Sequence, residues 1–274
     1  MAEEHLIAYL DESGIHSQAR VVAVAGFIAP SEQWNIFVPQ WMACLRKRGV
    51  GQVRAANLES GHGSFAGWPL DARAELRSEL ISTVLKNAIL GFGSAVVIDD
   101  FEHVGGGVLK KILGAPYFLA CQSAIIEATY RADLFLGAQG PIRFIFEQQP
   151  ELAGRVAKIY QAMRSERGLP HWHRLGPLEF RTKAEAPALQ AADLLVYESY
   201  KEIDNRHYNP TLPMRRSLQR LLSWGQQGGK YFDRAGLTAL LQELRNGGRL
   251  PPDYVLHDLG DESVAGNSGK GSHE

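Results

Sequence analysis

The chain has 274 residues, of which 45% are hydrophobic and 22% are charged, and its formal net charge at pH 7 is −1. This length suits one large domain, or one domain with an appendage, and the composition is that of an ordinary globular protein. A net charge so close to zero excludes strong steering of the whole molecule toward nucleic acid, although it leaves room for a local basic face.

The first five residues are acidic and lead directly into a short apolar run. They have neither the basic region nor the long apolar core of a signal peptide. No stretch reaches the roughly 18 consecutive apolar residues of a membrane span. Cys44 and Cys121 lack the spacing of a zinc site, so we expect reduced thiols. Together these observations predict a cytoplasmic protein that does not enter a membrane.

The first half of the chain predicts a β-hairpin, a helical segment and a third strand. Apolar runs predict strands at residues 6–10 and 20–28, and the short link between them predicts antiparallel pairing. Helical spacing follows from Ser31 to Gly49 and again after Pro69, with a glycine-containing loop at 50–67 between them. A third strand is expected at 89–98, and a glycine-containing loop or short helical turn at 101–114.

The second half alternates helices with strands. We expect helices at 116–136, 150–168 and 187–203, with strands at 142–146 and 178–180 between them. Two further helices are expected at 214–224 and 233–244, and the Gly-, Ser- and acid-rich tail at 258–274 is expected to be disordered. The order predicts an α/β fold, in which a mixed sheet carries helices on its faces.

Three carboxylates stand out in this order of elements. Asp11 and Glu147 each follow an apolar strand directly, so parallel pairing of the two strands would bring both acids to one sheet edge. Asp193 lies among alanines and leucines of the helix at 187–203, where an unpaired charge is costly. A metal ion or a hydrogen-bond partner would remove that cost.

Three converging carboxylates have a direct chemical meaning. They supply the hard oxygen ligands that Mg²⁺ and Mn²⁺ prefer, and two such ions about 4 Å apart activate water for phosphodiester cleavage. The alternative for each acid alone is that it forms a turn or caps a helix.

Two groups of basic residues could contact nucleic acid. Arg181 and Lys183, just before the Asp193 helix, are candidate phosphate contacts. Arg215, Arg216 and Arg220 form a basic stripe that would either follow a nucleic-acid backbone or simply face solvent.

Two motifs give these residues a family resemblance. The segments Tyr9-Leu10-Asp11-Glu12-Ser13-Gly14 and Leu189-Gln190-Ala191-Ala192-Asp193-Leu194-Leu195 resemble the hallmark motifs of domain of unknown function 3800, a family similar to the ribonuclease H-like superfamily. The resemblance implies a five-stranded ribonuclease H-like domain over residues 5–204 with helices on both faces and a helical insert at about 31–87. Residues 205–254 would then form a C-terminal helical extension.

The resemblance also implies roles for individual residues. Asp11, Glu147 and Asp193 would be the catalytic acids and would bind one or two Mg²⁺ or Mn²⁺ ions. Glu12, Ser13 and Gln190 belong to the same two motifs and would support the site, with Glu12 on the opposite face of its strand from Asp11.

The chain departs from the family pattern in two places. Gln52-Val53-Arg54 stands where family members often have a Glu, an apolar residue and a His or Lys. The candidates for a fourth acid are Glu127 and Asp133, and neither lies at the start of its helix, where such an acid is expected.

The sequence therefore favours a divalent-metal-dependent nuclease that acts on RNA, DNA or a hybrid of the two. The alternative is a non-catalytic module with a degenerate ribonuclease H-like site, which would bind nucleic acid or another protein.

Overall fold

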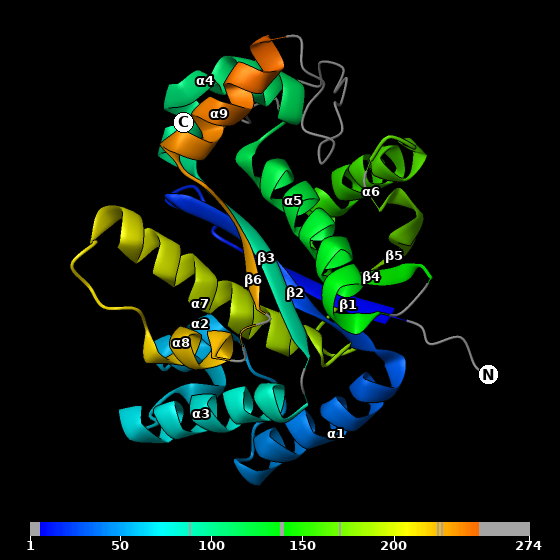
Figure 1. The fold of residues 1–274 in the computed structure, drawn as a ribbon. Helices are drawn as coiled ribbons and strands as arrows, with labels where there is room; N and C mark the ends of the chain where they lie inside the picture. The colour runs from blue at the N-terminus through cyan, green and yellow to red at the C-terminus, as the bar shows by residue number, and fades with distance from the viewer. Residues whose placement is uncertain are drawn as a thin grey trace, which may run out of the picture.

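A computed structural model of the chain describes residues 6–87, 89–137, 140–169, 171–223, 225 and 227–246 (Figure 1). Within them the fold is α/β, as expected. A mixed sheet runs through the centre, and helices cover both of its faces. The tail predicted to be disordered, 258–274, lies outside the described residues, as does residue 5.

The sheet contains six strands in the described residues, in the order β5-β4-β1-β2-β3-β6. Their bounds are β1 Leu6–Ser13, β2 Val21–Pro30, β3 Leu90–Val97, β4 Ile142–Glu147, β5 Leu175–Arg181 and β6 Gly228–Phe232. As expected, β1 and β2 form an antiparallel pair; β3 is antiparallel to β2. Both β4 and β5 run parallel to β1, and β6 runs parallel to β3.

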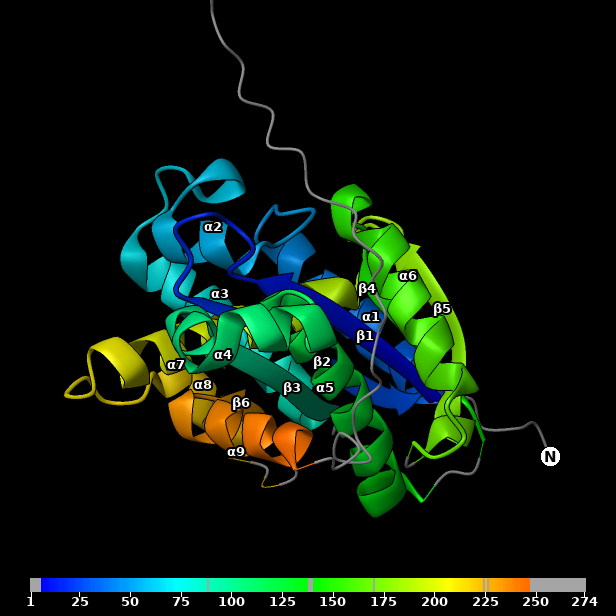
Figure 2. The same cartoon turned by 90° about the horizontal axis from the view of Figure 1, so that it is seen from above.

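Helices α4, α5, α6 and α9 cover one face of the sheet, and α1, α2, α3, α7 and α8 cover the other (Figures 1 and 2). The first group spans α4 Ile98–Leu113, α5 Pro116–Arg131, α6 Pro150–Ser165 and α9 Arg234–Arg245. The second spans α1 Ser31–Lys47, α2 Ala55–Ser60, α3 Leu70–Lys86, α7 Leu189–Tyr208 and α8 Arg216–Leu222. Short turns complete the chain: η1 Gly63–Phe65, the π-helical η2 Ala132–Leu136 and η3 Trp172–Arg174.

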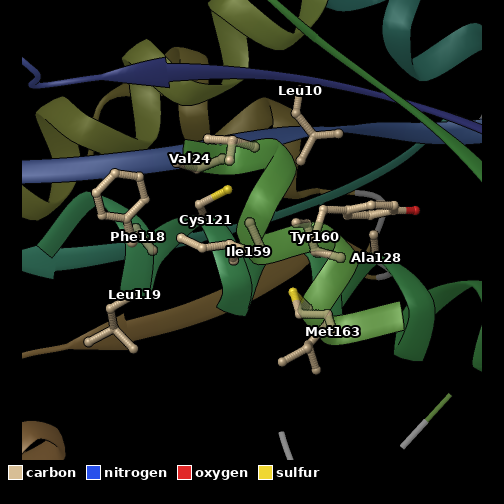
Figure 3. Close-up of a cluster of buried hydrophobic side chains, with 14 of the residues drawn as sticks. Leu10, Val24, Phe118, Leu119, Cys121, Ala128, Ile159, Tyr160 and Met163 are labelled. Atoms are coloured by element: carbon tan, nitrogen blue, oxygen red, sulfur yellow. The ribbon is translucent and has the colours of Figure 1, made fainter. Parts of the chain in front are cut away.

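Alternation along β1 divides its side chains between two hydrophobic cores. Leu6, Ala8 and Leu10 lie in the core beneath α5 and α6, whereas Ile7 and Tyr9 pack on the opposite side, beneath α1 and α7. Figure 3 shows the first core, where side chains of α5 and α6 approach Leu10 and Val24 of the sheet. Such period-2 alternation fixes the face on which each later residue of β1 must lie.

The helical insert predicted between the second and third strands contains α1, α2, η1 and α3. Its aromatic residues Trp34, Phe37 and Trp41 lie at helical spacing in α1 and are buried against the sheet. Tyr9, Trp34, Phe37 and Trp41 form a chain of ring contacts with centroid separations of 4.8–5.4 Å. The insert is therefore joined to the domain by a continuous core.

Three expectations about the fold were wrong. Residues 50–67, expected as a loop, contain the short helix α2 and the turn η1, because Leu58 and Phe65 are buried in the core there. Residues 101–114, expected as a loop or a short helical turn, belong mostly to the 16-residue helix α4, because Leu109 and Leu113 anchor that helix in the core while Gly105 takes up a kink inside it. The C-terminal region is not purely helical, because β6 pairs with β3 and makes the sheet six-stranded instead of five-stranded.

In the described part of the chain, no single helix has the length and apolar composition of a membrane span. One bent pair, Gly107–Leu113 with Pro116–Leu136, meets both criteria when its two parts are taken together.

Candidate functional site

The parallel pairing of β1 with β4 brings Asp11 and Glu147 together. The last paired residues are Leu10 and Phe146, so the two acids follow at the same end of adjacent strands. Alternation along β1 turns Asp11 toward the face covered by α7, and Asp193 lies in the second turn of that helix. The convergence predicted for the three acids is therefore present in the structure.

Lys183 lies between the three acids. Its Nζ atom is 2.7 Å from Asp11 Oδ2 and 3.5 Å from Asp193 Oδ1, and it donates a hydrogen bond to Glu147 Oε2. The Lys183 side chain is 2% exposed. We expected Lys183 to contact phosphate; in this structure its ammonium is instead engaged by Asp11, Glu147 and Asp193, because a buried ammonium requires anionic partners.

Backbone and amide groups hold the acids in place. The amide of Glu12 donates to Asp11 Oδ1 at 2.7 Å, and the amide of Ala55 donates to Asp193 Oδ2 at 2.5 Å. Hydrogen bonds to a carboxylate from fixed backbone donors favour its charged form and restrict its rotation. The start of α2, inside the helical insert, thus fixes one ligand candidate on α7.

Gln190 joins three segments around the site. Its Oε1 accepts hydrogen bonds from the Val53 amide at 3.0 Å and from Trp41 Nε1 at 3.4 Å. Its Nε2 donates to the Lys183 carbonyl at 3.5 Å. The expected supporting role of Gln190 therefore has a physical basis, since one buried amide fixes both the segment before α2 and the backbone of Lys183.

The site holds more negative than positive charge. Three carboxylates surround Lys183, and Arg54 approaches Glu147 Oε1 at 3.7 Å from the solvent side. Burial raises the pKa of Asp193 to about 6, with Lys183 opposing the rise and the Asp11 charge adding to it. Such raised values are the mark of acids whose charge is incompletely balanced.

Glu12 lies on the opposite face of β1, as expected, in the direction of Tyr117 and Cys121 of α5. Its side chain is buried, and its Oε1 has no hydrogen-bond partner among the described residues. Burial, followed by the Asp11 charge, raises the pKa of Glu12 to about 8. Glu12 is therefore a further buried acid next to Asp11 in β1, on the other face of the sheet.

The donor chemistry of the site fits a divalent cation, and its present arrangement does not form a metal centre. Asp11, Glu147 and Asp193 offer carboxylate oxygens, and the partner of Asp11 Oδ2 is the Lys183 ammonium at 2.7 Å. Those residues contain no group of three or more His, Cys, Asp or Glu spaced to hold an ion. The Lys183 ammonium lies at the point where the carboxylates meet.

The candidates for a fourth acid are engaged elsewhere. Glu127 pairs with Arg131 at 3.3 Å, and Asp133 pairs with Arg174 at 2.9 Å and with His171. Glu127 therefore pairs with a cation at the end of α5, and Asp133 pairs with cations in and next to η3, outside the site.

The predicted basic contacts also have structural partners. Arg181 pairs with Glu179 at 2.7 Å, and this hydrogen bond raises the pKa of the Arg181 guanidinium. In the proposed basic stripe, Arg215 pairs with the buried Glu198 and with Glu59, and Arg220 donates to hydroxyl groups of α3. Two members of the stripe thus connect helices to one another, which is a structural role.

Arg54 was not among the predicted site residues. Its side chain is 59% exposed and stands beside Glu147. The signal is present in the sequence, because Gln52-Val53-Arg54 stands at the position of the family's Glu, apolar residue and His or Lys. Only Gln52 departs from that pattern, since Arg54 keeps a basic residue at the third position.

The sequence matches no protein-family model, and no curated protein matches it significantly. The resemblance to domain of unknown function 3800 thus rests on the residues of the two motifs alone.

Proposed function

We propose that the chain is a divalent-metal-dependent phosphodiester hydrolase of ribonuclease H-like fold, related to domain of unknown function 3800, with a nucleic acid as its substrate. Support for the fold comes from three antiparallel strands in sequence order, followed by β4 and β5 added in parallel beside β1. The single observation that carries the function is the meeting of three carboxylates from β1, β4 and α7.

In this proposal Asp11, Glu147 and Asp193 hold Mg²⁺ or Mn²⁺. The bound ions would lower the pKa of a water nucleophile and stabilise the charge that develops on the leaving oxygen. Arg54 is exposed beside Glu147 and is placed to contact a phosphate oxygen of the substrate. Gln190 and the Ala55 amide limit the movement of the segments that carry these groups.

The test is cleavage of single-stranded, duplex and hybrid nucleic acids in the presence of Mn²⁺. Asp11→Asn keeps the size of the side chain and removes its charge, so we expect it to lower the cleavage rate by about 100-fold or more. Asp71→Asn, an exposed position in α3, is the matched control and should leave the rate unchanged. Cleavage that survives Asp11→Asn at the wild-type rate would contradict the proposal.

One observation favours a second candidate function. The Lys183 ammonium balances part of the carboxylate charge without a bound metal ion. The domain is therefore also suited to be a non-catalytic module that binds nucleic acid or protein. Calorimetric titration with Mn²⁺ separates the two functions, since the module predicts no binding to the wild-type chain.

A further inference from the structure

The Lys183 ammonium contacts all three candidate metal ligands. It pairs with Asp11, Glu147 and Asp193, and its side chain is almost completely buried. The three acids come from different elements, so the ammonium holds the ends of β1 and β4 and the start of α7 together. In this arrangement the lysine reduces the repulsion among the three carboxylates, as a bound metal cation would.

A lysine ammonium and a divalent ion cannot occupy this position together. Mg²⁺ binds carboxylate oxygens at about 2.1 Å, and Ca²⁺ at about 2.4 Å. An ion coordinated by the oxygens that now surround Nζ would therefore overlap with the ammonium, and two positive charges at such close range repel strongly. Binding of the ion requires Lys183 to leave.

We infer that Lys183 is a built-in counter-ion that holds the metal-free site together and that a divalent cation must displace before the site can act. This inference rests on the proposed metal-dependent function and adds a means of regulating it. The free energy of metal binding is then the intrinsic binding free energy of the three acids, made less favourable by the free energy needed to displace the lysine.

The chain allows such a displacement without refolding. Lys183 lies in the segment between Arg181, the last residue of β5, and Leu189, the first residue of α7. Its backbone carbonyl accepts a hydrogen bond from Gln190, so the backbone can stay in place while the ammonium moves. The flexible four-carbon stem of lysine supplies that movement.

The test compares Mn²⁺ binding by the wild-type chain, Lys183→Met and Lys47→Met, measured by calorimetry on the full chain. Methionine matches the apolar four-atom stem of Lys183 and lacks its ammonium, so we expect Mn²⁺ to bind about tenfold or more tightly. Lys47→Met removes the same charge from a residue that pairs with Glu79 at 3.6 Å, and it should bind Mn²⁺ as the wild type does.

The outcomes separate this inference from the proposed function. If the wild type binds Mn²⁺ and Lys183→Met binds it no more tightly, the inference is overturned and the proposed function stands. If only Lys183→Met binds Mn²⁺, the ion does not displace the lysine of the wild-type chain, so the inference is overturned and the wild-type chain acts as the module. If neither binds, both the proposed function and the inference fail.

Lys183→Met leaves three acids without their central cation, so the variant is expected to be less stable in EDTA. If the variant is unfolded in EDTA, far-ultraviolet circular dichroism during a Mn²⁺ titration measures whether its helices form again. Refolding on addition of Mn²⁺ supports the inference, because the ion replaces the lysine. A variant that stays unfolded at saturating Mn²⁺ overturns it.

Discussion

The Arg54 guanidinium lies 3.7 Å from Glu147 Oε1, and it is 59% exposed whereas the Glu147 side chain is 9% exposed. The pair therefore connects the buried acids to the surface. Arg54 offers donors to a ligand that approaches from solvent, whereas Lys183 does not, because its side chain is buried.

Arg54→Met should weaken the binding of a nucleic-acid substrate by about tenfold, seen as a higher KM with little change in kcat. The melting temperature should change little, since exposed ion pairs contribute about 0–1 kcal/mol. Arg181→Met is the matched control: Glu179 already engages that guanidinium, so we expect a smaller effect on KM. A larger effect for Arg181→Met would show that the phosphate contact lies at β5 instead.

Gln190→Leu should lower the free energy of unfolding by about 1–3 kcal/mol, because it leaves the Val53 amide and the Lys183 carbonyl without their buried partner. It should also weaken any Mn²⁺ binding, because the segment before α2 would be held less firmly. Chemical denaturation measures the first effect and calorimetry the second. Gln219→Leu, at an exposed position in α8, serves as the control and should change neither quantity.

The stability of the metal-free protein should fall as the pH rises from about 4.5 to 8. The pKa of Glu12 is raised from 4.5 to about 8 in the folded protein. The folded state therefore holds its proton more tightly than the unfolded chain, and the stabilisation present below pH 4.5 is lost as the pH rises through the folded pKa. The loss should be on the order of a few kcal/mol.

Denaturant unfolding in EDTA at several pH values measures this dependence. Glu12→Gln, which stays neutral, should flatten the curve over the same pH range. If the unfolding free energy of Glu12→Gln falls as steeply with pH as that of the wild type, other titrating groups cause the dependence.

Gly26→Ala should destabilise the fold by about 1–3 kcal/mol, because a Cβ atom at Gly26 would lie 1.9 Å from the Tyr9 carbonyl oxygen. Gly26 is paired with Leu10, so the strand that must shift is the one that carries Asp11. Thermal unfolding measures the loss. Gly51→Ala is the control: a Cβ there meets no atom within 4 Å, and its stability should stay within about 1 kcal/mol of the wild type.

The acids of the site could be predicted from the sequence because their positions follow from local patterns. Asp11 and Glu147 each follow a mostly apolar run that forms a strand, and Asp193 is surrounded by apolar residues of a helix. Period-2 alternation also gave the face of Glu12 correctly. These inferences needed only the type of each element and one assumption, that the first and fourth strands are parallel neighbours.

The position of Lys183 could not be predicted in this way. A lysine in a connecting segment is usually exposed, and only the three acids, from distant parts of the chain, make its burial favourable. The same holds for β6, whose Gly228 and Gly229 are poor strand formers and which forms a strand by pairing with β3. In α4, Gly105 to Gly107 suggested a loop, and the contacts of Leu109 and Leu113 outweighed that local preference.

The Asp11–Lys183 ion pair has a consequence for the order of events during synthesis. Asp11 leaves the ribosome before Lys183, together with the hairpin of β1 and β2, whereas its cation emerges only after β5. A nascent chain that ends before Lys183 must keep Asp11 and Glu147 hydrated, because neither carboxylate can be buried without a positive partner. The central strands therefore close over these acids only after the segment between β5 and α7 has been made.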